Sequence, residues 1–146
     1  MSQKKPYHLT AEQIARESHC GKNRWNGDPY ITHPRRIAAQ FGTPVLQAIS
    51  WLHDVLEDSN VSLKDLENFG MPGPVISAVK AITKQKNEEY KDYIMRVAKE
   101  PNARKVKIKD IEDNLNSIPQ CGHLRADKYK LSKWILEMVD EGRWEV

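Results

Sequence analysis

The stretch Trp51-Leu52-His53-Asp54-Val55-Leu56-Glu57-Asp58 brings one imidazole and three carboxylates together within six residues. Apolar residues precede and interrupt these groups at helical spacing, so we expect one helix over 44–58. At about 100° per residue, Glu57 lies about 40° around the helix axis from His53, and the apolar residues take the complementary arc. One side of this helix is therefore expected to be buried, while the adjoining side presents the imidazole and the acids together.

This acidic cluster has two interpretations. Three carboxylates that lie close together repel one another unless a cation holds them, which favours a site for a metal or for proton transfer. The alternative is a solvated helix end, since acidic last turns are common at protein surfaces. The negative end of the helix dipole disfavours anions there, so the functional interpretation is preferred.

The composition predicts one globular domain over residues 1–146. Charged residues make up 29% and hydrophobic residues 39% of the chain, as in folded soluble proteins. No apolar run approaches the roughly 18 residues of a membrane span, and the N-terminus lacks the apolar core of a signal peptide, so we expect a cytoplasmic protein. The net charge of +3 comes from interspersed acids and bases, which argues against a nucleic-acid binder. The oligomeric state is left open.

The two cysteines do not predict a disulfide framework, because Cys20 and Cys121 are too few and too far apart. A zinc site built from Cys121, His123, His19 and Cys20 is an alternative, but ordinary reduced thiols are favoured.

The remaining pattern is helical, and no β-alternating stretch of any length appears, so the fold class is predicted as all-α. Thr10-Ala-Glu-Gln13 predicts a helix start, and Thr43-Pro44 another. In the last helix, Leu131, Trp134, Ile135, Met138 and Val139 form a stripe that predicts either core or a partner surface. The helices are expected over 10–20, 32–41, 44–58, 62–69, 74–84, 87–100, 102–116 and 127–141.

Asp110 is the second informative residue. In the helix over 102–116 it points the same way as apolar residues such as Val106 and Ile111. A carboxylate that faces a core costs several kcal/mol unless it is paired or bound to a metal. An ion pair with Lys107 and a bound cation are both open at this point.

The loop over 21–31 is rich in turn residues, and it leads into Thr32-His33-Pro34 at a helix start. A lone histidine there is usually a cap or a surface residue. His33 becomes a ligand candidate only if it meets His53 in space. The nearby basic residues suit either phosphate groups on a small ligand or a solvated surface; they are Lys22, Arg24, Arg35 and Arg36.

Taken together, these segments resemble the HD phosphohydrolase superfamily, and more narrowly the ppGpp-hydrolase domains of the Rel/Spo family and the stand-alone small alarmone hydrolases. The resemblance covers about residues 10–116 and implies an all-α bundle of about 7–9 helices. The matching blocks come in the family's order: Ser18-His-Cys-Gly-Lys-Asn-Arg24, Gly27-Asp-Pro-Tyr-Ile-Thr-His-Pro34, Leu52-His-Asp-Val-Leu-Glu-Asp58, Ile82-Thr-Lys84, and Val106-Lys-Ile-Lys-Asp110 followed by Asn114.

The resemblance implies roles for eight residues. One divalent metal ion, Mn²⁺ in this family, is held by His33, His53, Asp54 and Asp110; the same donor set admits Zn²⁺ or Fe²⁺. Glu57 and Asp58 match the acidic pair that positions and deprotonates the attacking water. Arg24 matches a basic residue that packs on the nucleotide base, and Asn114 one that contacts the nucleoside.

The implied function is that of a metal-dependent phosphohydrolase that converts ppGpp and water to GDP and pyrophosphate. The alternatives are an HD phosphohydrolase acting on a nucleoside triphosphate, a monophosphate or NADPH, and a catalytically inactive HD regulatory module. Two departures from the family pattern remove positive charge near an anionic substrate. Trp25 stands where a basic residue is common, where it either stacks on a base or simply packs, and the Asp-Arg-x-x-Asn pattern reads Asp110-Ile-Glu-Asp-Asn114.

Overall fold

The computed structural model describes residues 4–118 and 123–146, and over these ranges the chain is all-helical, as predicted. An isolated bridge between Asn23 and Pro29 is the β-type pairing within the described residues. The helices are α1 (Tyr7–Ser18), α2 (Thr32–Ala38), α3 (Pro44–Leu52), α4 (Val55–Asp58), α5 (Leu63–Asn68), α6 (Gly73–Ile82), α7 (Tyr90–Ala98), α8 (Pro101–Ser117) and α9 (His123–Asp140).

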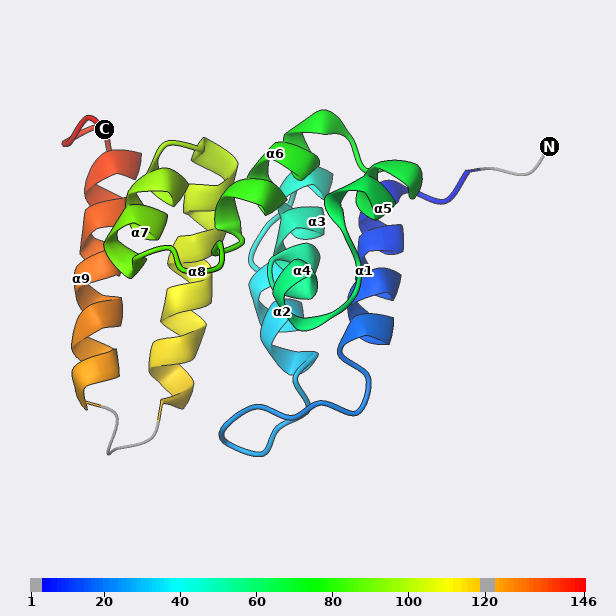
Figure 1. Cartoon of the computed structure of the whole chain (residues 1–146), viewed down its shortest axis with the longest axis horizontal. Helices are drawn as coiled ribbons and strands as arrows, with labels where there is room; N and C mark the ends of the chain where they lie inside the picture. The colour runs from blue at the N-terminus through cyan, green and yellow to red at the C-terminus, as the bar shows by residue number, and fades with distance from the viewer. Residues whose placement is uncertain (1–3, 119–122) are drawn as a thin grey trace.

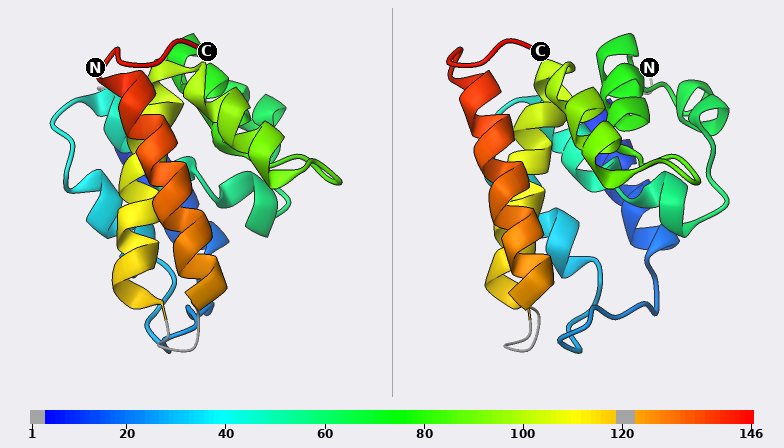
Figure 2. Two further views of the ribbon diagram at one scale, coloured as in Figure 1. Left: turned by 90° about the vertical axis from the view of Figure 1, so that its left-hand side faces the viewer. Right: turned by 60° about the vertical axis from the view of Figure 1, so that its left-hand side comes forward.

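Helices α3 and α8 form the centre of the fold. Helix α3 packs against α1, α2, α6 and α8, and α8 also contacts α2, α6, α7 and α9. Figure 1 shows α8 and α9 side by side at one end of the molecule and α1 at the other, and both views of Figure 2 keep α8 against α9. The core between these helices is apolar, with fully buried side chains such as Ile49, Leu52 and Ile111. Burial of each such side chain contributes about 1.5–3 kcal/mol.

Several helix starts follow from local chemistry that the sequence displays. The Thr43 hydroxyl accepts a hydrogen bond from the Leu46 amide and Pro44 follows it, so α3 begins there. Ser62 and Asp65 form a capping box at the start of α5. The helix is followed by Gly70 at φ 90°, a left-handed conformation that favours glycine.

The predicted helix over 44–58 is wrong in one respect, because the chain breaks into α3 and α4 at His53 and Asp54. The His53 ring Nδ1 donates to the Ser50 carbonyl oxygen at 2.7 Å, so a side chain takes an acceptor at the end of α3. Asp54 adopts φ −109° and ψ −2°, well away from the values of about −63° and −42° of a regular α-helix. The two residues therefore lie at a joint between helices, and the helical-wheel angles do not extend across it.

Both terminal helices also differ from prediction. Helix α1 begins at Tyr7, after Pro6, so Thr10 lies inside the helix and is not its cap. Helix α9 begins at His123, before the expected start. The predicted apolar stripe of α9 only partly enters the core: Leu131 and Trp134 are 60% and 53% exposed, whereas Val139 is buried. Leu136, which lies outside that stripe, is fully buried.

The alternative zinc site receives no support within the described ranges. Cys121 and the side chain of His123 lie outside them, Cys20 is an exposed free thiol, and His19 is buried. Over the same ranges, no helix has both the length and the apolar character needed to cross a membrane.

Arg96 on α7 holds the connection between α6 and α7. Its guanidinium donates to the carbonyl oxygens of Lys80, Ala81 and Thr83 at 2.9–3.1 Å. It also donates to both carboxylate oxygens of Glu88, at 2.8 and 3.0 Å. One side chain thus satisfies the free carbonyls at the end of α6 and fixes the loop that follows.

We expect Arg96→Ala to lower the free energy of unfolding by about 2 kcal/mol, because it removes several charge-assisted hydrogen bonds and leaves their acceptors unpaired. Urea unfolding followed by circular dichroism measures the change. The exposed Arg143, whose partner Glu141 is 3.6 Å away, provides the control; Arg143→Ala should change stability by no more than about 0.5 kcal/mol. Equal effects of the two substitutions would contradict the role given to Arg96.

The same contact predicts a pH dependence of stability. The hydrogen bond from Arg96 lowers the pKa of Glu88 from 4.5 to about 2. A lowered folded-state pKa means that this contribution is complete above pH 4.5 and is lost as the pH falls toward 2. The difference in unfolding free energy between the wild type and Glu88→Gln should therefore shrink over that interval. A difference that stays constant with pH would show that the charge of Glu88 is not involved.

Candidate active site

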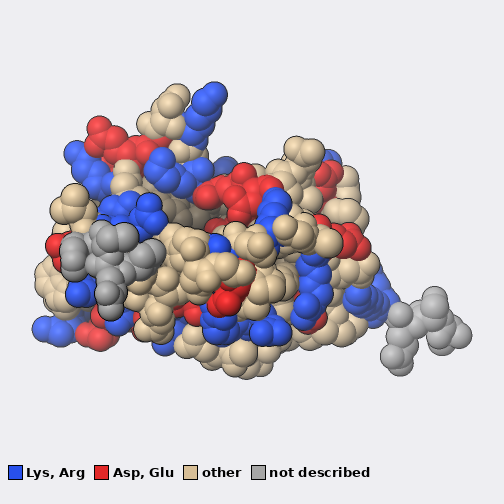
Figure 3. Space-filling view, turned by 90° about the horizontal axis from the view of Figure 1, so that it is seen from below, with Lys and Arg blue, Asp and Glu red and all other residues tan. Residues whose placement is uncertain are grey.

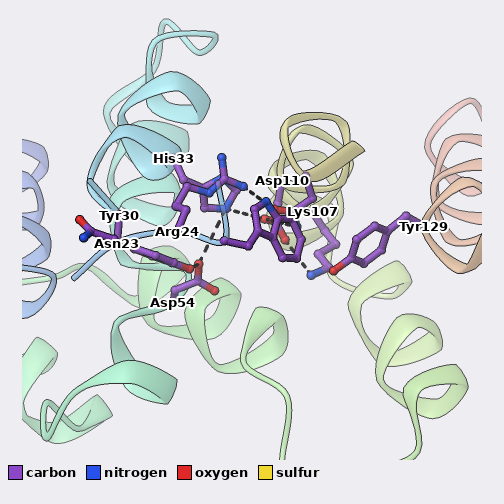
Figure 4. A pocket seen from close by; sticks show the side chains of 10 residues that line it. Asn23, Arg24, Tyr30, His33, Asp54, Lys107, Asp110 and Tyr129 are labelled. Carbon is purple, nitrogen blue, oxygen red and sulfur yellow. Dashed lines mark hydrogen bonds and ion pairs between the residues drawn. The ribbon is translucent and has the colours of Figure 1, made fainter. Parts of the chain in front are cut away.

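Four predicted ligand residues from three parts of the chain meet at one cavity: three line its wall, and His53 lies directly behind them. His33 comes from the first turn of α2, His53 and Asp54 from the joint between α3 and α4, and Asp110 from the middle of α8. The cavity has a volume of about 320 Å³, and His33, Asp54 and Asp110 line it. Figure 4 shows the side chains of His33, Asp54 and Asp110 pointing toward one another from separate parts of the chain.

The distances among these side chains are short. His33 Nε2 lies 2.8 Å from Asp110 Oδ1, and His53 Nε2 lies 2.9 Å from Asp54 Oδ2. The two Nε2 atoms are 3.2 Å apart, and His53 Nε2 is 3.4 Å from Asp110 Oδ1. One ligand atom from each of His33, His53 and Asp54 lies within 4.8 Å of the others. The structure therefore brings all four residues together. The condition set for His33, that it meet His53 in space, is fulfilled.

The far nitrogen of each imidazole is held by an acceptor. His53 Nδ1 donates to the Ser50 carbonyl oxygen at 2.7 Å, and His33 Nδ1 donates to Asp113 Oδ2 at 2.6 Å. Because a carbonyl and a carboxylate oxygen only accept, both hydrogens are assigned to Nδ1. In the neutral rings, both Nε2 lone pairs then face the same point, where they repel each other unless a cation lies between them. This donor set fits a divalent metal ion.

Asp110 uses its two oxygens differently, so the two interpretations of this residue are compatible. Oδ2 accepts from Lys107 Nζ at 2.7 Å, which is the predicted ion pair. Oδ1 faces the imidazoles of His33 and His53. Burial raises the pKa of Asp110, but opposing interactions outweigh it, the charge of Lys107 being the largest of them, so the net pKa is lowered well below its ordinary value. The carboxylate is thus held ionised inside the core.

Glu57 and Asp58 lie one turn further along, on α4, and outside the residues that line this cavity. Glu57 Oε1 accepts from the Lys84 amide at 2.8 Å, and Lys22 donates to the Asp58 carbonyl oxygen. Desolvation raises the pKa of both carboxyl groups, and the charge of Asp54 raises them further. Both acids therefore lie within the field of the His/Asp cluster without contacting it.

Arg24 and Asn114 do line the cavity, and their side chains are hydrogen-bonded to each other. Arg24 NH2 donates to Asn114 Oδ1 at 2.9 Å, and NH1 donates to Asp113 Oδ2 at 3.0 Å. Arg24 is 8% exposed, so its guanidinium is engaged within the protein. Trp25 is 42% exposed at the rim, and Arg125 lies over its ring at 5.0 Å.

The structure adds residues that sequence reasoning missed. The Tyr30 hydroxyl donates to Asp54 Oδ2, and Tyr129 of α9 lines the opposite wall (Figure 4). Tyr30 lies inside the quoted Gly27–Pro34 block, so a signal was present. Helical spacing puts Asp113 about 60° from Asp110 on the side away from Ile111, among polar residues of α8. It is nevertheless only 9% exposed, because α2 packs against α8. Tyr129 gave no signal in the sequence.

Comparison with known proteins agrees with this geometry, although no family model matches the chain. The bifunctional (p)ppGpp synthase/hydrolase SpoT of Escherichia coli strain K12 is 30% identical over 129 residues, which cover 79% of this chain and 18% of SpoT. A guanosine-3′,5′-bis(diphosphate) 3′-pyrophosphohydrolase of Aquifex aeolicus is 30% identical over 123 residues, 74% of this chain and 17% of that protein. The chain thus spans less than a fifth of the length of these relatives.

A solved structure shares the fold. It is described as a metazoan ortholog of SpoT that hydrolyzes ppGpp, and it matches with a TM-score of 0.74 at 20% identity, over 98% of this chain and 96% of its own. The chain therefore has the all-helical fold of the HD-type hydrolase domain. Within that class it resembles the SpoT/Rel ppGpp pyrophosphohydrolases, which confirms the resemblance drawn from the motifs.

Proposed function

We propose that this chain is a metal-dependent phosphohydrolase that converts ppGpp and water to GDP and pyrophosphate. The observation that carries the proposal is the meeting of His33 and His53 with Asp54 and Asp110 beside one cavity. The relatives whose names include this activity support the choice of substrate.

The four side chains would hold one divalent ion, with Mn²⁺ as the proposed metal. Such an ion lowers the pKa of water and offsets the charge that builds on phosphorus. The protein contributes by keeping the donors in place. Ser50 and Asp113 fix the imidazoles, and Lys107 holds Asp110 ionised.

Glu57 and Asp58 are proposed to position the attacking water and take its proton. Desolvation raises the pKa of both groups, which makes each carboxylate a stronger base than an ordinary one. The water oxygen forms a bond to the phosphorus that carries the 3′ oxygen. The bond between that phosphorus and the 3′ oxygen breaks, and the 3′ oxygen leaves with the nucleoside and gains a proton. Pyrophosphate and GDP account for all the atoms.

A polyanionic substrate suits the basic side of the cleft. Figure 3 shows a hollow with Lys and Arg side chains gathered on one side and acids on the other. Burial lowers the pKa of Lys128, and the charges of Arg125, Lys107 and Lys84 lower it further. Lys128 thus lies close enough to three other cations for their charges to disfavour its own, an arrangement that a bound polyphosphate would relieve.

The nucleoside is proposed to lie between two walls of the cavity. Trp25 and Asn114 form one wall, and Tyr129 forms the other. The exposed Trp25 ring offers a surface for a base, and Asn114 lines the adjoining wall. Arg24, whose guanidinium is engaged by Asp113 and Asn114, supports this wall.

Incubation of the purified protein with Mn²⁺ and ppGpp tests the proposal. GDP and pyrophosphate are expected as products, identified by ion-exchange chromatography, and a chelator in the buffer should stop their formation. The proposal fails if ppGpp survives while another nucleotide is cleaved.

A second candidate is an HD phosphohydrolase for another nucleotide. The observation that favours it is Trp25, an aromatic residue at the rim where the family often has a basic one. A panel of nucleoside triphosphates, monophosphates and NADPH under the same conditions distinguishes the two candidates by their products.

A further inference from the structure

Asp113 lies directly behind His33 and faces it from another helix. His33 is in the first turn of α2 and Asp113 is in the last turns of α8, so their contact joins segments 80 residues apart in the chain. Asp113 Oδ2 accepts from His33 Nδ1 at 2.6 Å, on the opposite side of the ring from Asp110. The imidazole is therefore held between two carboxylates, one at each nitrogen.

Two guanidinium groups hold Asp113 in turn. Arg36, one turn after His33 on α2, donates from Nε to Oδ1 at 2.6 Å and from NH2 to Oδ2 at 2.9 Å. Arg24 donates from NH1 to Oδ2 at 3.0 Å. The parallel hydrogen bonds from Arg36 fix the plane of the carboxylate as well as its position. Asp113 thus receives four hydrogen bonds from three side chains and is 9% exposed.

We infer that Asp113 is a positioning residue that aims the Nε2 of His33 at the metal-binding cluster, and that Arg24 and Arg36 hold Asp113 for this task. A carboxylate behind a ligating imidazole fixes the ring's tautomer and orientation and makes the other nitrogen a better donor. The inference rests on the metal site of the proposed function, and it gives Asp113 and Arg36 a role that neither the motifs nor the relatives' names assign to them.

A simple structural role for Asp113 has a different signature. If the carboxylate only joins α2, α8 and the loop over 21–31, its loss lowers stability and leaves the affinity of the cluster for metal unchanged. If it orients His33, metal affinity falls even where the protein remains folded. Mn²⁺ binding to the full chain, measured by isothermal titration calorimetry without any nucleotide, separates the two.

Asp113→Asn keeps the size of the side chain but removes its charge, and it turns an amide N–H toward one of its donors. We expect its dissociation constant for Mn²⁺ to rise by about 10–100-fold. Asp140→Asn is the matched control, because Asp140 also accepts from two cations of α8, Arg104 and Lys105, at 2.9–3.3 Å. This control should bind Mn²⁺ like the wild type.

Arg36→Gln provides a second test should Asp113→Asn fail to fold, since it leaves the carboxylate and the Arg24 contact in place. A smaller loss of Mn²⁺ affinity in the same direction is expected. Wild-type affinity in whichever of these variants folds, as shown by circular dichroism, would overturn the inference. The inference also falls if the wild type binds no Mn²⁺, whereas a failure to cleave ppGpp would count against the proposed substrate alone.

Discussion

His53→Ala is expected to abolish both metal binding and phosphohydrolase activity. The residue supplies one of two facing Nε2 atoms, and it lies within 3.4 Å of Asp54 and Asp110. A bound metal stabilises transition-state charge by several kcal/mol, and about 4 kcal/mol corresponds to a factor of about 10³ in rate. We therefore expect kcat/KM for ppGpp to fall by at least that factor, together with the loss of Mn²⁺ binding in calorimetry.

His8→Ala is the matched control for this substitution. His8 is a partly buried histidine in the first turn of α1, outside the residues that line the cavity. Its removal should leave metal affinity and kcat/KM within about twofold of the wild type, a change below 0.5 kcal/mol. If His53→Ala retained Mn²⁺ binding, the proposed ligand set would be wrong even if activity were lost.

Glu57→Gln is expected to separate chemistry from metal binding. The amide cannot take a proton from water, and general-base catalysis contributes about 10²–10⁴-fold to a rate. We expect kcat to fall within that range while the dissociation constant for Mn²⁺ remains unchanged, because Glu57 lies outside the cluster of ligand atoms. Single-turnover assays and calorimetry on the same protein provide the two measurements.

The pH dependence gives a second check on Glu57. Because the pKa of Glu57 is raised above 4.5, the ordinary value for glutamate, the ionised base is lost at a pH above 4.5 as the pH falls. The acid limb of kcat/KM should therefore lie above that value in the wild type. Glu67→Gln serves as the control, since Glu67 lies on α5 with 51% of its side chain exposed. A Glu57→Gln enzyme with full kcat would remove this residue from the chemistry.

Much of the fold could be predicted because its signals are local. The Thr43-Pro44 start of α3, the apolar faces and the Gly70 stop of α5 each depend on residues within one turn of the feature that they produce. The break at His53 could not be predicted in this way. It depends on a ring that takes the Ser50 carbonyl, and helical periodicity does not include such a competitor.

The candidate site was predictable to the extent that its motifs are contiguous. His53 and Asp54 are neighbours in sequence, whereas the meeting of His33 with Asp110 depends on how α2 crosses α8, which no local pattern specifies. Asp113 shows the limit most clearly. A helical wheel identifies the outer arc of α8, but only the packed structure shows that α2 covers it and turns a presumed surface acid into the partner of His33.

The contact between Arg24 and Asp113 also affects how the proposed nucleotide substrate reaches the cavity. Arg24 belongs to the loop over 21–31, and to swing away from α8 this loop must separate a buried guanidinium from its carboxylate. Opening would break this charge-assisted hydrogen bond, so the position of the loop against α8 is favoured. We therefore expect the loop over 21–31 to stay in place against α8. Molecules should enter and leave the cavity through its existing opening.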